Sequence, residues 1–479
     1  MKLFKYIYMG SLLIATTSCG NEWLNLEPST SIETETSINI LSDVEFTLNG
    51  IYSDMQSSDA YSGRLVYYGD VTGDDMQAVS LSKRTGDYYN LGFTKDNGPS
   101  SHWKNLYSFI QNTNLILNNI DRIDATDDEE YRDDLKGQAL AIRGMALFDL
   151  TRIFGYPYTK DNGASLGVPI VSKSEGIESK PARNTVAECY TQVISDLTAA
   201  VSLLSGDFNK GKINKWAAMS LLSRVYLYKG DNANALAMAE AAIEGAEDEG
   251  WELWSHDDYA LAWAEDATAI APGEVLFEIV NTTTDSPGKE SMGYLNSKSG
   301  YDDMCITSSF YALLLEDPDD VRLKLLSFDG KKYAYVFKYQ PQEGEVIQDA
   351  NVPLIRLAET YLNAAEAAVK LGDNETAVKY LDPIVRRANP DKTVEGMTLT
   401  LEDVLNERRK ELVAEGHRMF DIIRNGMTVE RFDVSNSAIK NTKHFSKNLE
   451  FDWNFHKIVL PIPKAEMDTN PNMVQNPGY

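Results

Sequence analysis

Two distant segments of the chain share one pattern of helix, tight turn and helix, and this repeat constrains the fold most. Residues 217–245 contain LLSRVYLYKGDNANALAMAEAAIEG, and residues 354–388 contain LAETYLNAAEAAVKLGDNETAVKYLDPIVRRA. In each copy a glycine can end the first helix in the left-handed conformation, and the aspartate that follows can cap the second. Small alanines let the two helices approach closely. The pattern is that of a tetratricopeptide-type helix pair, so we expect a helical scaffold whose pairs are separated by insertions.

Apolar periodicity predicts further long helices outside the repeat. Apolar side chains recur at roughly helical steps over residues 103–123 and again over residues 132–154, where Gly155 and Pro157 end the run. A single short apolar strand is expected over residues 274–280. The predicted fold class is therefore all-α, or mainly helical, with an irregular loop-rich part and minor short strands.

The beginning of the chain predicts export and a lipid anchor. Lys2 and Lys5 precede an apolar run over residues 7–15, which is too short to span a bilayer and is followed by small residues and Cys19. We expect residues 1–18 to be a lipoprotein signal peptide that is removed, and Cys19 to carry acyl chains such as palmitate. Thr16 stands where the lipobox before the lipidated cysteine usually has leucine or valine. The alternative is an ordinary secreted protein. Residues 19–40 are polar and suit a tether.

Composition excludes several classes of partner. The formal net charge of −27 repels nucleic acid and anionic lipid headgroups, which leaves the acyl chains as the expected contact with an outer membrane. Cys189 and Cys305 do not form a disulfide framework, and Cys189 is expected to be a small buried hydrophobe within a helix. The five histidines are scattered, with no HExxH or CxxC spacing, so no metal site and no cofactor is expected.

One stripe of charges invites a catalytic interpretation and favours a structural one. Arg408, Glu411, Glu415 and Arg418 step by three and four residues, which would place them on one helix face. Two glutamates could form an acid and base pair, but a general acid needs a raised pKa and flanking arginines lower it. We therefore expect a structural ion ladder, continued by Asp421 and Arg424.

Aromatic residues gather in two insertions, over residues 56–102 and 250–303. Long loops on a rigid frame commonly carry binding sites, and a flat aromatic ring can cover the apolar face of a sugar. Trp103, Trp216, Tyr226 and Tyr361 are expected to pack within the scaffold instead. The remaining aromatic candidates for ligand binding are Tyr67, Tyr68, Tyr88, Tyr89, Trp254, Trp263, Tyr294 and Tyr301.

Polar side chains in the same loops could bind the hydroxyl groups of a sugar. Asp74 and Asp75 are candidate ligand-binding residues for this reason, and Arg64 and Arg84 could act alongside the tyrosines. Adjacent aspartates in an extended chain point to opposite faces, so Asp74 and Asp75 are not expected to act jointly as catalysts.

Several segments in order resemble the SusD/RagB family of outer-membrane nutrient-binding lipoproteins. They are RGMALFDLTRIFG (143–155), GKINKWAAMSLLSRVYLYKGD (211–231), EVLFEI (274–279), VPLIRLAETYLNAAEA (352–367), ERRKELVAEGHRMFDIIR (407–424) and the tail LPIPKAEMDTNPNMVQNPGY (460–479). The resemblance runs from Cys19 to Tyr479. It implies a SusD-like fold with four tetratricopeptide-like helix pairs and a loop-rich half that binds glycan.

The resemblance also implies an arrangement along the chain and a partner. Residues 41–479 would form a single SusD-like domain, with an N-terminal half over 41–215 and a C-terminal half over 216–479. The partner would be a SusC-like TonB-dependent transporter, over which the lipoprotein sits as a lid and to which it passes an oligosaccharide. Family members are not catalysts. A peptide-binding role, as in the RagB branch, is the alternative, and a glycoside hydrolase is a further one.

Overall fold

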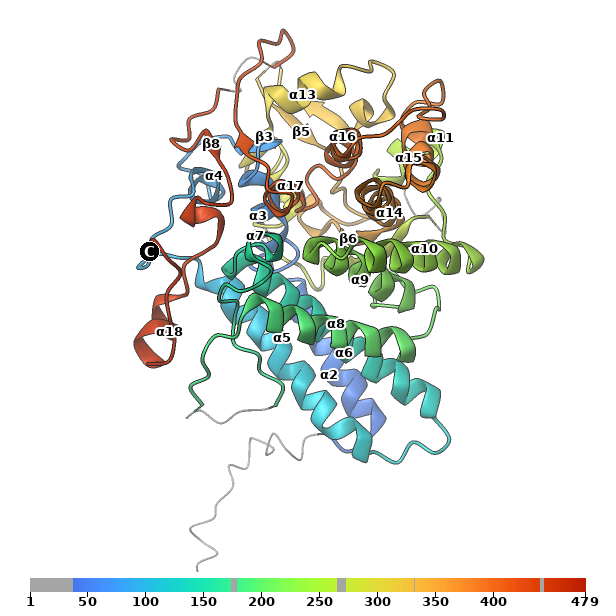
Figure 1. Ribbon diagram of the computed structural model, residues 1–479, viewed down its shortest axis with the longest axis vertical. Helices are drawn as coiled ribbons and strands as arrows, with labels where there is room; N and C mark the ends of the chain where they lie inside the picture. Colours follow the sequence, from blue (N-terminus) through green and yellow to red (C-terminus); the bar gives the residue numbers. More distant parts are fainter. Residues whose placement is uncertain (1–37, 174–178, 265–272, 331, 440–442) are drawn as a thin grey trace, which may run out of the picture.

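The computed structural model describes residues 38–173, 179–264, 273–330, 332–439 and 443–479, and Figure 1 shows the arrangement of their helices and strands. The helices are α2 (Leu41–Met55), α3 (Arg64–Val71), α4 (Gly86–Asn90), α5 (Ser100–Asn119), α6 (Glu129–Phe154), α7 (Tyr158–Asp161), α8 (Val186–Leu203), α9 (Lys215–Lys229), α10 (Asn232–Asp248), α11 (His256–Ala262), α12 (Met292–Leu295), α13 (Ser308–Leu314), α14 (Leu357–Leu371), α15 (Asn374–Ala388), α16 (Leu401–Glu411), α17 (Arg418–Arg424) and α18 (Lys464–Thr469). The mainly helical class predicted from the sequence is confirmed.

The long helices pack in succession, as Figure 1 shows. α2, α5, α6 and α8 lie side by side in the lower half of that view, and α9 and α10 follow above them. α10 then packs on α14, and α14 packs on α15 and α16. Because α9–α10 and α14–α15 are the two copies of the repeat, the long insertion between them in sequence does not separate them in space.

The repeat turns have the predicted geometry. Gly230 and Gly372 take positive φ values of 80° and 78° at the ends of α9 and α14, a conformation that costs glycine little. The Asp231 side chain then accepts from the amide of Asn234, and the Asp373 side chain accepts from that of Thr376. Each aspartate therefore caps the following helix.

The scaffold buries the residues that the sequence assigned to packing. Trp103 and Trp216 are both buried in the main apolar core, and Tyr226 and Tyr361 pack against it half-buried. Cys189 is fully buried on α8 and its thiol approaches the carbonyl of Val168 at 3.4 Å, so it is the small buried hydrophobe that was expected.

The strands are short and pair as two-stranded antiparallel ladders in the part of the chain that is described. They are β1 (Met76–Ala78) with β3 (Met304–Ile306), β2 (Val275–Ile279) with β6 (Val352–Arg356), β4 (Leu326–Phe328) with β5 (Ala334–Val336), and β7 (Val429–Glu430) with β8 (Glu450–Phe451). The expected strand at 274–280 is β2. Its pairing with β6, which leads directly into α14, joins the second insertion to the scaffold.

The sequence predicted that the charged stripe lies on one helix face, and the structure shows that it does not. α16 ends at Glu411 and α17 begins at Arg418, with Glu415 between them, because Ala414 and Gly416 turn the chain at φ values of 69° and 84°. A Cβ on Gly416 would meet the carbonyl oxygen of Val66 at 2.9 Å, so glycine is required at this close approach. Local spacing predicted a continuous helix, but this turn interrupts it.

The stripe nevertheless forms ion pairs, as predicted, with partners on other elements. Arg408 donates to Asp421 at 2.7 Å, and Arg424 binds both Asp421 and Glu366. Glu411 and Glu415 accept from Arg356 at 3.2 and 2.7 Å.

Arg356 is the centre of this buried network. It is 1% exposed, and besides Glu411 and Glu415 it pairs with Glu274, the residue before β2. Arg387 on α15 binds the other oxygen of Glu274 at 2.6 Å. One guanidinium therefore links β6, the α16–α17 connection and the β2 edge.

We predict that Arg356→Met lowers the free energy of unfolding by about 3–5 kcal/mol, because it removes the central cation from three buried carboxylates. Urea unfolding of the purified chain measures this change. As a control, Lys136→Gln removes the exposed pair with Asp121 and should change stability by less than about 1 kcal/mol. Equal effects of the two variants would contradict the structural role of the network.

We also predict that acid destabilises the fold through two buried histidines. Burial lowers the pKa of His102 to about 3, and burial also lowers the pKa of His417 to about 3. Since an unfolded histidine titrates near pH 6.5, the unfolded state takes up protons first as the pH falls, and stability present above about pH 6.5 is lost below it.

The free energy of unfolding should fall by about 1.4 kcal/mol per pH unit for each histidine, between about pH 6.5 and the pKa of that histidine in the folded protein. Urea unfolding at several pH values measures it, and the slope should be smaller in a His102→Gln, His417→Gln double variant. An unfolding free energy that stays constant from about pH 7 to pH 4.5 would contradict the prediction.

Candidate functional site

Four of the predicted ligand-binding tyrosines are core residues in this structure. Tyr67, Tyr68, Tyr88 and Tyr89 are each at most 4% exposed. Tyr88 packs edge-on against Tyr67 at 5.2 Å between ring centroids, and its hydroxyl pairs with His102 at 3.1 Å. In this conformation these rings are covered by other parts of the protein and present no face to a ligand.

Tyr89 is enclosed from several sides. Its hydroxyl pairs with the imidazole of His444 at 2.5 Å, and the guanidinium of Arg431 lies 4.5 Å from the ring centroid. Arg431 in turn donates to backbone carbonyls, among them those of Gly73 and Thr72. Tyr89 thus helps to join the C-terminal segment to the first insertion.

Asp74 and Asp75 are also interior, and their placement differs from the expectation. Arg418 approaches Asp74 at 2.6 Å and Asp75 at 3.2 Å, so the two carboxylates meet one cation rather than pointing to opposite faces. Arg409 pairs with Asp75 as well. The chain bends here before β1, which removes the alternation of an extended strand.

Trp254 and Trp263 line a narrow polar cleft beside β2 and β6. They are 8% and 4% exposed, and their rings meet edge-on at 5.3 Å. Neither indole nitrogen has a hydrogen-bond partner among the described residues. The cleft, of about 60 Å³, is also lined by the polar side chains of Lys210, Glu278, Gln340, Gln342 and Asn351. The cations of Lys338 and Arg356 lie 5.2 and 5.0 Å from the ring centroid of Trp263, so this ring face is covered by the protein itself.

Tyr294 and Tyr301 differ from the other candidates because they are only half-buried. Their rings meet edge-on at 4.8 Å, and the guanidinium of Arg84 lies 3.8 Å from the centroid of Tyr301. Arg84 also binds Glu290 at 3.1 Å, and Glu290 pairs with Arg64 at 3.1 Å. We call these five residues the tyrosine cluster.

The loop that carries both tyrosines is held by backbone bonds and one buried carboxylate. The amide of Tyr301 donates to the carbonyl of Tyr294 at 2.8 Å, which closes the loop. Asp303 is fully buried and accepts from Arg84, while its own carbonyl accepts from the hydroxyl of Thr85. Gly300 is required, because a Cβ there would collide with the carbonyl oxygen of Tyr294.

The same loop borders a surface hollow of about 380 Å³. Its walls are Asn296, Ser297, Lys298, Ser299, Ser327, Tyr335 and Phe337. Phe337 is 43% exposed, and Asn296 is fixed by donating to the carbonyl of Val336 at 2.6 Å. Aromatic surface, hydroxyls and charged groups from this loop and from the β4–β5 ladder thus lie next to one another, a combination that suits a polyhydroxylated ligand.

Comparison with known proteins decides the family. A family model described as "SusD family" matches residues 329–479, and one described as "Starch-binding associating with outer membrane" matches residues 22–227. A crystal structure of a SusD superfamily protein from Bacteroides vulgatus is 38% identical, covers 92% of this chain and 100% of its own, and superposes with a TM-score of 0.86. This chain belongs to the SusD family.

Further relatives point to the same family. A protein from Bacteroides vulgatus, provisionally named as sugar-binding, is 74% identical, covers 93% of this chain and 100% of its own, and has a TM-score of 0.91. The starch-binding protein SusD of Bacteroides thetaiotaomicron is 32% identical over 143 residues, which are 29% of this chain and 24% of that protein. The resemblance drawn from the sequence is confirmed.

Sequence reasoning did not identify two acidic residues at the tyrosine cluster of this SusD-family chain, Glu290 and Asp303. Acidic residues are abundant in the sequence, and neither of these two has a local pattern around it. The only usable signal was their position beside Tyr294 and Tyr301 in the same insertion. Arg64 and Arg84 were singled out and belong to the cluster: both bind Glu290, and Arg84 also lies over the ring of Tyr301.

We predict that alanine substitutions distinguish core tyrosines from cluster tyrosines. Tyr88→Ala should lower the free energy of unfolding by about 3–5 kcal/mol, because it opens a cavity in the core. Tyr294→Ala should lower it by about 1 kcal/mol or less, since its ring is partly exposed. Denaturant unfolding of both variants measures the difference, and similar losses would show that Tyr294 also belongs to the core.

Proposed function

We propose that this SusD-family chain is a non-catalytic glycan-binding lipoprotein of the outer membrane, exposed at the cell surface. The family description of starch binding with outer-membrane association and the names of its relatives support this role. Cys19 would carry the lipid after removal of residues 1–18, and residues 19–40 would form the tether. Cys19 lies outside the described residues. None of the described helices is long and apolar enough to cross a bilayer.

The observation that carries the proposal is the half-buried pair Tyr294–Tyr301 with Arg84 and Glu290 beside it. Exposed aromatic surface can cover the C–H face of a sugar ring, while guanidinium and carboxylate groups bind its hydroxyls. Arg84 and Glu290 are each more than a third exposed as side chains, so both can still meet a ligand.

The ion pairs of Glu411 and Glu415 argue against their use as the acid and base of a hydrolase. A glycosidase needs a carboxylic acid whose pKa is raised toward neutrality and a second carboxylate across the cleft. Burial alone would raise the pKa of Glu411, but Arg387, Arg356 and Arg322 lower it to about 2. Arg356 and Lys338 likewise lower the pKa of Glu415 despite its burial. Neither glutamate can hold a proton for a leaving group at neutral pH.

We further propose that captured oligosaccharide passes to a SusC-like TonB-dependent transporter, with this chain acting as its lid. An affinity in the micromolar to millimolar range, or about −4 to −8 kcal/mol, suits a ligand that must be released inward. The domain arrangement expected from the sequence, with halves over 41–215 and 216–479, belongs to the same proposal.

We predict that calorimetric titration with starch or laminarin oligosaccharides detects saturable binding to the chain. Tyr301→Ala should weaken it by about tenfold or more, the scale of losing one stacked ring and its guanidinium partner. Phe46→Ala removes an 81% exposed aromatic side chain from α2 and serves as the matched control, which should bind as the parent does.

Three outcomes of this titration would contradict the proposal. Binding of a peptide pool without any glycan binding would favour the RagB-like alternative. Appearance of shortened sugars over hours would show a hydrolase. Undiminished glycan binding by Tyr301→Ala would place the site away from the tyrosine cluster.

A further inference from the structure

Two further cations adjoin the tyrosine cluster, beside the two arginines that belong to it. Lys83 donates to the backbone carbonyl of Tyr301, and the ammonium of Lys289 lies 5.8 Å from the ring centroid of Tyr294. Lys289 is exposed and forms no ion pair with any described residue. Its charge is therefore available to a ligand that reaches the rings.

The carboxylates that pair with these cations are fewer, and one of them points inward. Arg64 pairs with Asp59 at 2.9 Å and with Glu290 at 3.1 Å, and both carboxylates are partly exposed. Lys83 pairs with Asp303 at 3.4 Å, but the side chain of Asp303 is fully buried. Among the described residues, the ion pairs of the cluster thus present two carboxylates at the surface against four cations.

The other charged groups of the loop have partners of their own. Lys298 pairs with Asp329, and Asp302 accepts from the hydroxyl of Tyr335. The whole chain carries a net charge of −27, but most of that charge is screened over distances beyond about 10 Å at physiological salt. The charge that a bound ligand meets is therefore set mainly by the cluster and the cations around it.

Both arginines keep one nitrogen free for a ligand. Arg84 uses Nε on Glu290 and Nη1 on Asp303, and its Nη2 has no acceptor among the described residues. Arg64 likewise binds its two carboxylates through Nε and Nη2, and its Nη1 has no acceptor in the same part of the chain. Guanidinium and ammonium groups donate only, and their hydrogen bonds are strongest to charged acceptors, so with Lys289 they favour an anionic group.

The two rings lie where a sugar acid can use them together with these cations. Tyr294 and Tyr301 meet at an interplanar angle of 86°, so their faces point in different directions. The guanidinium of Arg84 covers one face of Tyr301 at 3.8 Å, whereas the ammonium of Lys289 is too far from Tyr294 to cover its ring. The partly exposed ring of Tyr294 can therefore receive the apolar C–H face of a sugar with a cation on either side.

We propose that the glycan bound at the tyrosine cluster is acidic, namely an oligosaccharide that contains uronic acid. The C–H face of one sugar lies against Tyr294, and its carboxylate accepts from Lys289 and from Nη2 of Arg84. A neutral sugar binds through the same rings without these ion pairs, and therefore more weakly. This inference rests on the proposed glycan function and adds the class of sugar to it.

The test compares glycans that differ in charge alone. An array carries uronic-acid oligosaccharides of several linkages beside the same compounds after reduction of each carboxylate to an alcohol, together with sulfated neutral oligosaccharides. The purified chain should bind an acidic compound about tenfold more tightly than its reduced form, the scale of two exposed ion pairs. Calorimetric titration of the acidic and reduced forms measures the ratio.

Charge changes at Lys289 test the residue itself. Lys289→Gln should weaken binding of the acidic compound about threefold and Lys289→Glu about tenfold, while the reduced compound binds as before. Because Lys289 is exposed, both variants should fold as the parent does. Lys136→Gln makes the same charge change on α6, where the lysine pairs with Asp121, and should leave binding of both compounds unchanged.

The contrary outcomes separate this inference from the proposed function. Equal binding of the acidic and reduced forms would overturn the inference and leave a site for neutral glycans. Tighter binding of sulfated compounds than of uronic acids would overturn the assignment to a carboxylate. Undiminished binding of the acidic compound by Lys289→Glu would overturn the role of this lysine. Binding of no glycan on the array would contradict the proposed function itself, and the inference with it.

Discussion

The buried pairing of arginines with carboxylates is the interaction on which the two kinds of structure in this chain depend. Helix pairs can stack on one another through alanine and leucine faces, but the described part of the irregular half has short helices and short two-stranded ladders to order it. Arg356 meets Glu274, Glu411 and Glu415, and through them ties β2, β6 and the α16–α17 connection together. Because a buried ion without its partner is strongly unfavourable, such a network specifies one arrangement of these segments.

The aromatic residues of the two insertions also help to order the irregular half. A long irregular segment with few strands must bury large side chains to remain ordered, and Tyr67, Tyr88 and Tyr89 fill that role. Tyrosine suits it because its ring packs in the core while its hydroxyl finds a partner such as His102 or His444. Aromatic enrichment in a loop therefore signals a packed loop as much as a binding loop, and only exposure separates Tyr294 and Tyr301 from the others.

Local chemistry explains what could be predicted from the sequence. The turns at Gly230 and Gly372 depend on a few adjacent residues, so their conformation and caps followed from spacing alone. Arg408 and Arg418 were expected to share a helix, but the turn at Gly416 depends on the close approach of Val66, which lies far away in sequence. The same limit applies to Asp74 and Asp75, whose partners on α16 and α17 come from the other end of the chain. Site residues fixed by such long-range contacts leave no local pattern.

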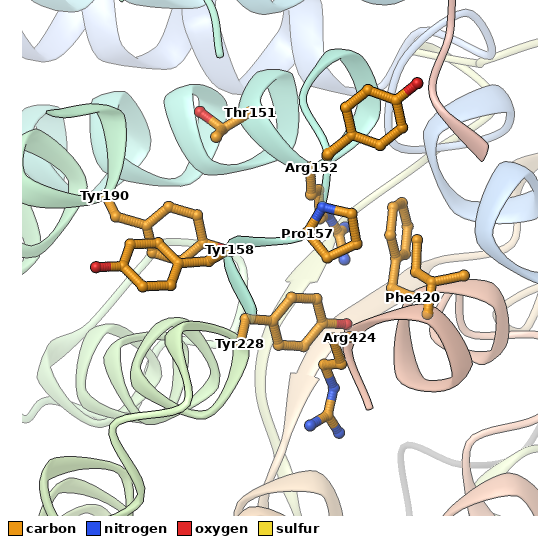
Figure 2. A pocket seen from close by; sticks show the side chains of 10 residues that line it. Thr151, Arg152, Pro157, Tyr158, Tyr190, Tyr228, Phe420 and Arg424 are labelled. Atoms are coloured by element: carbon orange, nitrogen blue, oxygen red, sulfur yellow. The ribbon is translucent and has the colours of Figure 1, made fainter. Parts of the chain in front are cut away.

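Satisfied and unsatisfied polar groups separate structural from functional residues more clearly than residue type does. Arg408 and Arg424 use their nitrogens on neighbouring carboxylates and so have little left to offer a ligand. Arg152 has the same chemistry and a comparable place beside α17, yet one of its nitrogens has no acceptor among the described residues. Rigid surroundings hold that nitrogen in place without a partner, which is the condition for a preorganised contact. The aromatic cavity of Figure 2, of about 20 Å³, can therefore hold a small hydrogen-bond acceptor such as a water molecule beside this nitrogen.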